Sequence, residues 1–422
     1  MRILAALALL APGLALAEFR ASAVKLDITP SSPQWLMGYA ARQSTGVHDR
    51  IYHRIAALSD GATEVYLISS DLCVFSPGVY DDFTAALEKR TGIHPKQVWW
   101  MATHTHSAPE VGPPGMYDAL LHGRSDHDWS RDYLAFVTSS LEEGILKARA
   151  ALEPARVAIG VGTARANINR RARDLDGTIS LGLNPDGPVD RQIGLIRLER
   201  RDGAPIALIA NYAMHGTALG GRSTQISADA PGAAAAYVEE KFGAPVLYVN
   251  GAAGDIAPIY SVYDTPRAAH LGEFRILLGD RILEANRALR GAAQPALELA
   301  EATVETPRKS GLGWPAELGR YAARTAGGED LVRLPIRYLR IGDAAIWSAP
   351  VELFCEIALR VRAESPFRQT FYFGYANGWL GYLPTAAAFR EGGYEPRTSP
   401  FTPDAERDLG NAVSAFLAGW VR

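Results

Sequence analysis

The chain has 422 residues, with 43 lysines and arginines against 46 aspartates and glutamates, which gives a formal net charge of −3. So small a charge provides no electrostatic basis for binding nucleic acid or an anionic membrane surface. The length is enough for two or three hydrophobic cores, or for one large α/β domain.

The first 17 residues have the pattern of a secretory signal peptide. A positive charge at Arg2 precedes an apolar run that ends in the small-x-small sequence Ala-Leu-Ala at 15–17. The run is too short to span a bilayer as a stable helix, and no later stretch reaches about 18 uninterrupted apolar residues. We therefore expect cleavage after residue 17 and a mature chain, 18–422, that has no transmembrane segment and is periplasmic or secreted. An uncleaved N-terminal anchor is the alternative.

Strands and helices are expected to alternate along the mature chain, because short β-rich runs are followed by segments with a helical period. The expected strands are 65–69, 97–101, 155–160, 192–198, 204–213, 246–249, 297–306, a β-pair around 334–348, and 369–375. The expected helices are 80–89, 130–150, 230–241, 264–289, 351–363 and 404–419. With no internal repeat and no obvious linker, this order favours a single large α/β domain in which mixed β-sheets are flanked by helices.

Cysteine chemistry is not expected to drive the function. Only two cysteines occur, Cys73 and Cys355, and they form no metal-ligand spacing. Export permits a disulfide between them, and two buried free thiols are the alternative.

A pair of histidines follows the expected strand 97–101. His104 and His106 lie in a Thr-His-Thr-His sequence, and on an extended segment residues i and i+2 point to the same side. The segment opens into a Gly/Pro loop, 108–115, and such strand ends are where α/β proteins place ligands. One histidine is expected to bind a metal while the other faces the same pocket. A hydrogen-bonded pair on a solvated edge is the alternative.

His215 is a second candidate, because it also follows an apolar strand and precedes a glycine-containing turn. Zinc in hydrolases takes a few histidine and carboxylate ligands and keeps one position open for water. Two histidines at separate strand ends suit that need, although spacing alone does not bring them together. Four carboxylates are candidates, and each fits a helix cap or first turn equally well: Asp71, Asp229, Asp255 and Glu352.

An ordered series of motifs resembles the neutral/alkaline ceramidase family, the zinc amidases that release fatty acid from N-acylsphingosine. The series covers almost the whole mature chain, which makes it more specific than any single motif. In chain order the matching segments are 26–30, 37–40, 46–52, 69–72, 103–107, 166–170, 215–217, 226–229, 254–258, 349–352 and 378–382.

The resemblance implies a zinc ion held by two histidines, a carboxylate and a phenol: His104, His215, Glu352 and Tyr382. A phenol bound to zinc would lose its proton far below its usual pKa of about 10. Metal-activated water would be the nucleophile. His106 would shuttle protons, and Arg170 and Tyr394 would stabilise the developing oxyanion.

Two features depart from the family pattern. Ala257 stands where ceramidases carry a serine in a Gly-Asp-Val-Ser-Pro motif, so any mechanism that needs that hydroxyl is excluded. Metal–water chemistry needs no side-chain nucleophile and is unaffected. The chain also ends shortly after the expected C-terminal helix, where ceramidases continue into a further β-rich domain.

The resulting prediction is a zinc-dependent hydrolase of a linear amide or related acyl bond, with a small-molecule or lipid-like acyl substrate. Its oligomeric state is left open. One alternative is a true neutral ceramidase, an N-acylsphingosine amidohydrolase, and the other is a non-catalytic exported binding protein. The ceramidase alternative predicts an apolar groove to which five aromatic residues would contribute unless they are ordinary core: Trp99, Trp100, Phe373, Tyr375 and Trp379.

Overall fold

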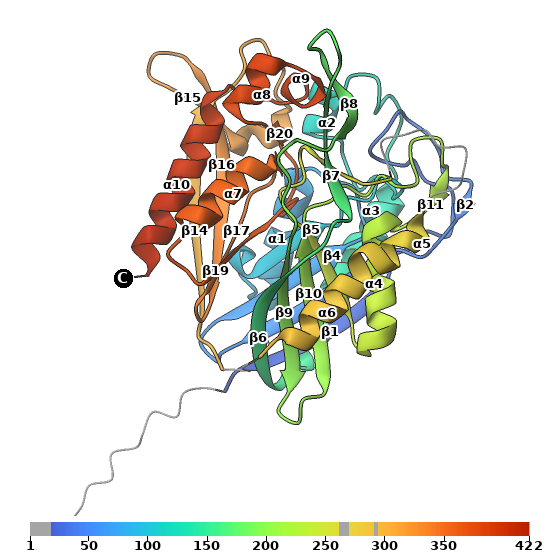
Figure 1. Ribbon diagram of the computed structural model, residues 1–422, viewed down its shortest axis with the longest axis vertical. Helices are drawn as coiled ribbons and strands as arrows, with labels where there is room; N and C mark the ends of the chain where they lie inside the picture. Colours follow the sequence, from blue (N-terminus) through green and yellow to red (C-terminus); the bar gives the residue numbers. More distant parts are fainter. Residues whose placement is uncertain (1–17, 261–269, 291–293, 422) are drawn as a thin grey trace, which may run out of the picture.

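The computed structural model describes residues 18–260, 270–290 and 294–421 (Figure 1). The predicted signal peptide, 1–17, lies outside the described residues, so its cleavage stays a prediction. Among the described residues, no helix combines the length and the apolar character that crossing a bilayer requires.

An eight-stranded mixed sheet has the strand order β12-β10-β9-β6-β1-β3-β4-β5. Only the two outermost pairs, β10–β12 and β4–β5, are parallel. Strand β5 is buried along its whole length, as expected for a strand covered on both faces. The strands are β1 Arg20–Asp27, β3 Tyr52–Ser59, β4 Glu64–Ser70, β5 Val98–Ala102, β6 Glu153–Thr163, β9 Gln192–Arg200, β10 Pro205–Tyr212 and β12 Val246–Asn250.

A second sheet, ordered β14-β16-β17-β19, packs face to face with the first. Trp99 from the first sheet shares one apolar core with Ile346 and Phe371 from the second. The short strand β15 pairs with β16 at the edge. The strands are β14 Leu297–Pro307, β15 Ala322–Arg324, β16 Asp330–Ile341, β17 Ala344–Ser348 and β19 Gln369–Phe373.

Helices cover the outer faces of both sheets (Figure 1). Helix α3 packs on β1 and β3, α4 on β12, and α6 on β6 and β9, whereas α10 packs on β14 and α7 on β19. The longer helices are α1 Pro77–Thr91, α3 Arg131–Ala150, α4 Asp229–Phe242, α6 Arg281–Ala288, α7 Cys355–Glu364 and α10 Asp404–Trp420. The shorter ones are η1 Pro95–Gln97, α2 Met116–Leu120, α5 Leu271–Phe274, the π-helical η2 Arg275–Asp280, η3 Ala316–Tyr321, α8 Ala386–Glu391 and α9 Tyr394–Arg397. The predicted fold, mixed sheets flanked by helices, is confirmed.

Three small sheets are formed by short strands that lie outside the two large sheets. They pair β2 with β11, β18 with β20, and β7 with both β13 and β8. Their strands are β2 Gly46–Val47, β7 Asn167–Arg173, β8 Ile179–Asn184, β11 Gln225–Ile226, β13 Ile256–Pro258, β18 Glu352–Leu353 and β20 Tyr382–Leu383.

The predicted helix 351–363 begins too early. Glu352–Leu353 instead pairs in parallel with Tyr382–Leu383, and α7 starts at Cys355. The Asp255 carboxylate, which lies far from α7 in the sequence, accepts a hydrogen bond from the Cys355 backbone N–H at 2.9 Å. This N–H has no acceptor within the helix, so Asp255 provides the missing partner at the start of α7. Residues 264–269 of the predicted helix 264–289 lie outside the described residues, and the rest is helical from Leu271 to Ala288, with the π-helical η2 between α5 and α6.

Candidate metal centre

The two histidine segments meet where β5 and β10 end. The Gly216 N–H donates to the His104 carbonyl at 3.1 Å, and the His106 N–H donates to the Gly216 carbonyl at 2.8 Å. His104 has φ +67°, so the segment is not extended as the sequence analysis assumed. This left-handed conformation costs a non-glycine residue about 1–2 kcal/mol, which the surrounding backbone bonds offset.

Three side-chain atoms that can bind a metal ion converge within this buried region. His104 Nε2 lies 3.3 Å, and His215 Nε2 3.1 Å, from Glu352 Oε2. On the other side of each ring, Nδ1 lies 3.0 Å from a backbone carbonyl, that of Cys73 for His104 and that of Ile256 for His215. An Nδ1–H that donates to a carbonyl fixes the tautomer and leaves the Nε2 lone pair free for a ligand.

This donor set fits a zinc ion. Two imidazoles and a carboxylate are a common protein ligand set for catalytic zinc, and donors at about 2.0–2.1 Å from a tetrahedral ion lie about 3.3 Å apart. Burial lowers the pKa of His215 to about 3, with the nearby Arg170 charge acting in the same direction, so the neutral, ligating form is favoured at pH 7.

Glu352 is held by two aromatic donors. Trp379 Nε1 donates to Oε1 at 2.9 Å, and the Tyr375 hydroxyl lies 3.3 Å from Oε2. All five aromatic residues proposed for a lipid groove are buried, which confirms their alternative role as core: Trp99, Trp100, Phe373, Tyr375 and Trp379.

Tyr382 is placed beside Glu352 by the parallel pairing of β18 with β20. Its hydroxyl accepts a hydrogen bond from Arg170 Nη2 at 3.1 Å. Burial raises the pKa of Tyr382 well above its usual value, and the Glu352 carboxylate adds to this effect while Arg170 opposes it. The phenolate form expected of a zinc ligand therefore needs further positive charge beyond Arg170 at this position.

Arg170, on β7, connects the cluster to a buried carboxylate that the sequence analysis missed. Its Nη1 donates to His215 Nε2 at 2.9 Å, and its Nε donates to Glu395 Oε1 at 2.9 Å. Glu395 is 1% exposed and also accepts from Arg171 Nη1 at 2.8 Å. Ligation of a metal by His215 requires the contact with Arg170 Nη1 to open. The only sequence signal for Glu395 is its position next to Tyr394.

His106 packs against the His104 side chain on one side and the backbone at Gly38 on the other. Its Nε2 is 3.1 Å from His104 Nε2, and its Nδ1 is buried without a hydrogen-bond partner in the described part of the chain. A Cβ atom on Gly38, which has φ +104°, would lie 2.5 Å from Nδ1. Only glycine therefore allows the chain to pass so close to this imidazole. Burial lowers the pKa of His106 well below its usual value, and the other two histidines lower it further.

Tyr394 borders the cluster instead of entering it. It is half-buried at the start of α9, and its ring centroid lies 5.7 Å from that of Tyr382. The structure thus gathers all seven predicted site residues in one region, with three of them, His104, His215 and Glu352, in direct mutual contact.

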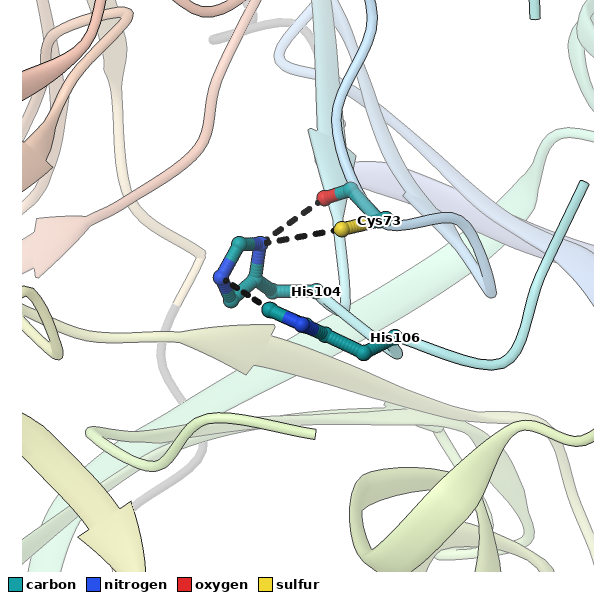
Figure 2. A group of neighbouring side chains, drawn as sticks. All are labelled: Cys73, His104 and His106. Carbon is teal, nitrogen blue, oxygen red and sulfur yellow. Dashed lines mark hydrogen bonds between the residues drawn. The ribbon is translucent and has the colours of Figure 1, made fainter. Parts of the chain in front are cut away.

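Cys73 lies on the Nδ1 side of the His104 ring, as Figure 2 shows, with Sγ 3.9 Å from His104 Nδ1. Cys73, His104 and His106 also have ligand atoms within 4.8 Å of one another. Burial raises the pKa of the Cys73 thiol well above its usual value, which favours the protonated form. Cys73 and Cys355 are both buried and free, so the alternative of two free thiols is confirmed.

The other three candidate carboxylates have structural partners. Asp71 pairs with the buried Arg54 at 2.8 Å. Asp229, at the start of α4, accepts three backbone N–H groups. Asp255 accepts from the Cys355 N–H and from Asn169 Nδ2. The first-turn interpretation therefore holds for Asp229. Asp255 precedes strand β13 and bonds to the start of the distant helix α7, and Asp71 forms an ion pair, so neither caps a helix of its own segment.

Asp255 is expected to make stability depend on pH. Burial raises its pKa from 3.8 to about 7, so the folded state binds this proton more tightly than the unfolded state does. Stability from this group is present below about pH 4 and is lost as the pH rises to 7, by up to ~4 kcal/mol. Urea unfolding in the presence of a chelator should therefore show a flatter pH profile for Asp255→Asn than for the unchanged protein. Parallel profiles would contradict this. The lost acceptor for Asn169 lowers stability at every pH and does not affect the comparison.

The fold and the cluster define an α/β protein with a buried candidate zinc centre at its strand ends. Residues 19–257, more than half of the chain, match the family model described as neutral/alkaline non-lysosomal ceramidase, N-terminal. The chain therefore belongs to the neutral/alkaline non-lysosomal ceramidase family, as the motif series predicted.

Individual relatives agree with this assignment. Neutral ceramidase B of Dictyostelium discoideum is 27% identical over 248 residues, which cover 52% of this chain and 31% of that protein. Neutral ceramidase of Mycobacterium tuberculosis is 27% identical over 224 residues, covering 49% and 33%. The chain thus spans about a third of the length of these curated relatives.

A solved structure supports the fold. The crystal structure of neutral ceramidase from Pseudomonas aeruginosa superposes with a TM-score of 0.78 at 18% identity, covering 96% of this chain and 74% of that one. The superposition extends through the second half of this chain, beyond the residues that the family model matches.

Proposed function

We propose that this protein is a zinc-dependent hydrolase that cleaves an amide or related acyl bond with water, and that it acts after export through its signal peptide. The observation that carries the proposal is the convergence of His104 Nε2, His215 Nε2 and Glu352 Oε2, with both imidazoles held from behind by backbone carbonyls. Family membership supports hydrolysis of an amide, because the relatives are ceramidases by name.

Zinc at this cluster would supply a water that ionises near neutral pH and a Lewis acid for the substrate carbonyl. The residues that would hold it are His104, His215, Glu352 and Tyr382. Glu352 brings a negative charge that offsets the metal's, and Trp379 and Tyr375 keep its carboxylate in place. Arg170 holds the Tyr382 hydroxyl through Nη2.

His106 is the proposed proton carrier. Its Nε2 faces the cluster beside His104 Nε2, and its Nδ1 has no competing partner among the described residues. It would accept a proton from the attacking water and deliver one to the leaving nitrogen. The close approach of Gly38 and the Tyr39 ring, centred 4.9 Å away, restricts the imidazole to this orientation.

Arg170 and Tyr394 are the proposed oxyanion donors. Glu395 anchors Arg170 through Nε, Nη2 donates to the Gly254 carbonyl and the Tyr382 hydroxyl, and Nη1 is directed at His215 in the cluster. Charge-assisted donors of this kind act where negative charge develops on the former carbonyl oxygen, and removing one commonly lowers kcat by about 100–1,000-fold.

Ceramide itself is the second candidate substrate, because the relatives are named for it. Ala257 bears on that choice. It lies buried in β13, paired with Ile168 on β7 and one residue after the Ile256 carbonyl that holds His215. A serine hydroxyl is thus missing next to the cluster, and a substrate that needs it is disfavoured.

Metal removal and restoration test the proposal. Purified mature protein would be offered N-acylsphingosines, N-acyl amino acids and simple esters as isolated, after chelation and after return of zinc. We expect about one zinc per chain and hydrolysis that falls at least ~100-fold on chelation and returns with zinc. His104→Ala should lose both, whereas His122→Ala, an exposed histidine outside the cluster, should keep both. Absence of stoichiometric zinc, or activity indifferent to chelation, would favour the non-catalytic binding protein.

A further inference from the structure

Two loops form one wall beside His106. The first loop, around Tyr39, packs on the imidazole. The second loop follows α2, and α2 itself contacts the first loop, because the Tyr117 hydroxyl donates to the Tyr39 carbonyl at 3.2 Å. Each loop contributes one arginine to this wall, Arg42 from the first and Arg124 from the second.

Arg42 is fixed next to the proposed proton carrier. Its Nη2 donates to the His106 carbonyl, and its Nε donates to the Ser223 carbonyl at 2.9 Å. The guanidinium carbon lies 4.9 Å from the centre of the Tyr39 ring. The remaining nitrogen, Nη1, is buried and has no hydrogen-bond partner among the described residues.

Arg124 lies near two of the tyrosines that border this region. It is half-buried, and its guanidinium charge lies close enough to the phenols of Tyr117 and Tyr394 to oppose the rise in pKa that burial causes in each. The Tyr394 ring also packs against the ring of Tyr382, so Tyr394 lies between Arg124 and Tyr382. Within the described ranges, neither Arg42 nor Arg124 forms an ion pair with a carboxylate, whereas Arg170 is paired with Glu395.

Two guanidinium groups without counter-charges favour an anion. Leaving a charged group partly buried with unpaired N–H donors costs free energy, and the planar fork of arginine matches a carboxylate in particular. The buried carboxylate of Glu110 is already bonded to His127 Nε2 at 2.8 Å and not to either arginine. An anionic ligand would supply the counter-charge that both arginines lack.

We propose that the substrate carries a carboxylate on the amine side of its scissile amide, as in an N-acyl amino acid, and that Arg124 and Arg42 bind it. This inference rests on the proposed function. The amine side is favoured because Arg42 holds the backbone of His106, which would protonate the leaving nitrogen. In the reaction, the water oxygen bonds to the carbonyl carbon, the C–N bond breaks, and the nitrogen takes a proton. The products are a free acyl carboxylate and an amino acid.

Binding of matched non-hydrolysable ligands tests the carboxylate site without relying on turnover. The probes are two ketones in which CH₂ replaces the amide nitrogen of N-lauroylglycine and of N-lauroylethanolamine, so they differ only in a terminal carboxylate against a hydroxymethyl group. Calorimetry on the purified mature protein should show the carboxylate bound at least ~10-fold more tightly, the usual effect of a charge-assisted pair. The hydrolysis of the two amides should show the same order in kcat/KM.

Arg124→Gln should lower this carboxylate preference about 10-fold, and Arg124→Lys should restore part of it, since the charge returns without the fork. Arg131→Gln is the matched control, because it removes an exposed arginine from the neighbouring helix α3 and should leave the preference unchanged. Equal binding of the two ketones by the unchanged protein would overturn the inference, as would equal effects of Arg124→Gln and Arg131→Gln. A clear carboxylate preference without hydrolysis of either amide would support the carboxylate site and count against the proposed hydrolase.

Discussion

The Glu352→Gln variant is expected to bind zinc at least ~100-fold more weakly than the unchanged protein and to lose hydrolytic activity with it. The carboxylate Oε2 is the atom on which both imidazole Nε2 atoms converge, at 3.3 and 3.1 Å. A neutral amide of the same shape removes the negative charge that offsets a divalent ion, and it can place an N–H where a lone pair is required. Zinc affinity would be measured by competition with a chromophoric chelator.

Glu110→Gln provides the matched control for that variant. Glu110 is also a buried carboxylate bonded to a histidine, His127, but it lies outside the His104–His215–Glu352 cluster. Its replacement should leave zinc affinity within about twofold. Tight zinc binding by Glu352→Gln would show that the carboxylate is not a ligand and would remove the main support for the proposed centre.

The His106→Gln variant is expected to keep its zinc and to lose most of its turnover. A positioned proton carrier commonly contributes about 100- to 10,000-fold to the rate, and glutamine cannot take its place because it does not titrate. The residue is not bonded to Glu352, and its loss leaves His104, His215 and Glu352 in place. Steady-state kinetics and zinc analysis on the same preparation would separate the two effects.

The outcome for zinc decides the role of His106. Its Nε2 lies 3.1 Å from His104 Nε2, close enough for ligation by a small movement. Loss of zinc together with activity would make His106 a metal ligand and contradict its assignment as a proton carrier. Retention of both zinc and turnover would leave proton transfer to another group or to solvent.

The amino-acid sequence by itself determined the class of fold and the family. Strand and helix periods along the chain predicted mixed sheets flanked by helices, since each period reports which side of an element is buried. Local sequence also placed His104 and His215 correctly just after strands. The ordered motifs carried the family assignment because eleven short matches in one order are far less ambiguous than one.

Other features depended on contacts between distant segments. The helix expected from residue 351 begins at Cys355, because Glu352 and Leu353 form a strand that pairs with β20. The i, i+2 argument for the histidines also failed locally, because pairing with the strand end at Gly216 sets His104 in the left-handed region. Trp99, Trp100 and Phe373 are core because both faces of their sheets are covered, and Tyr375 and Trp379 are buried in the segment that follows β19.

Only the tertiary structure decided which polar groups meet. The partnership of Arg170 with Glu395 joins residues 225 positions apart, and that of His104 with Glu352 crosses most of the chain. No local pattern encodes such pairs, because they arise when separate strand ends are brought to one edge by sheet pairing and core burial. The same is true of the unpaired Arg42 and Arg124, whose lack of a counter-charge is a property of the folded surroundings and of no single segment. The sequence thus determined which residues were available for chemistry, and the packing of the two sheets decided which of them share a site.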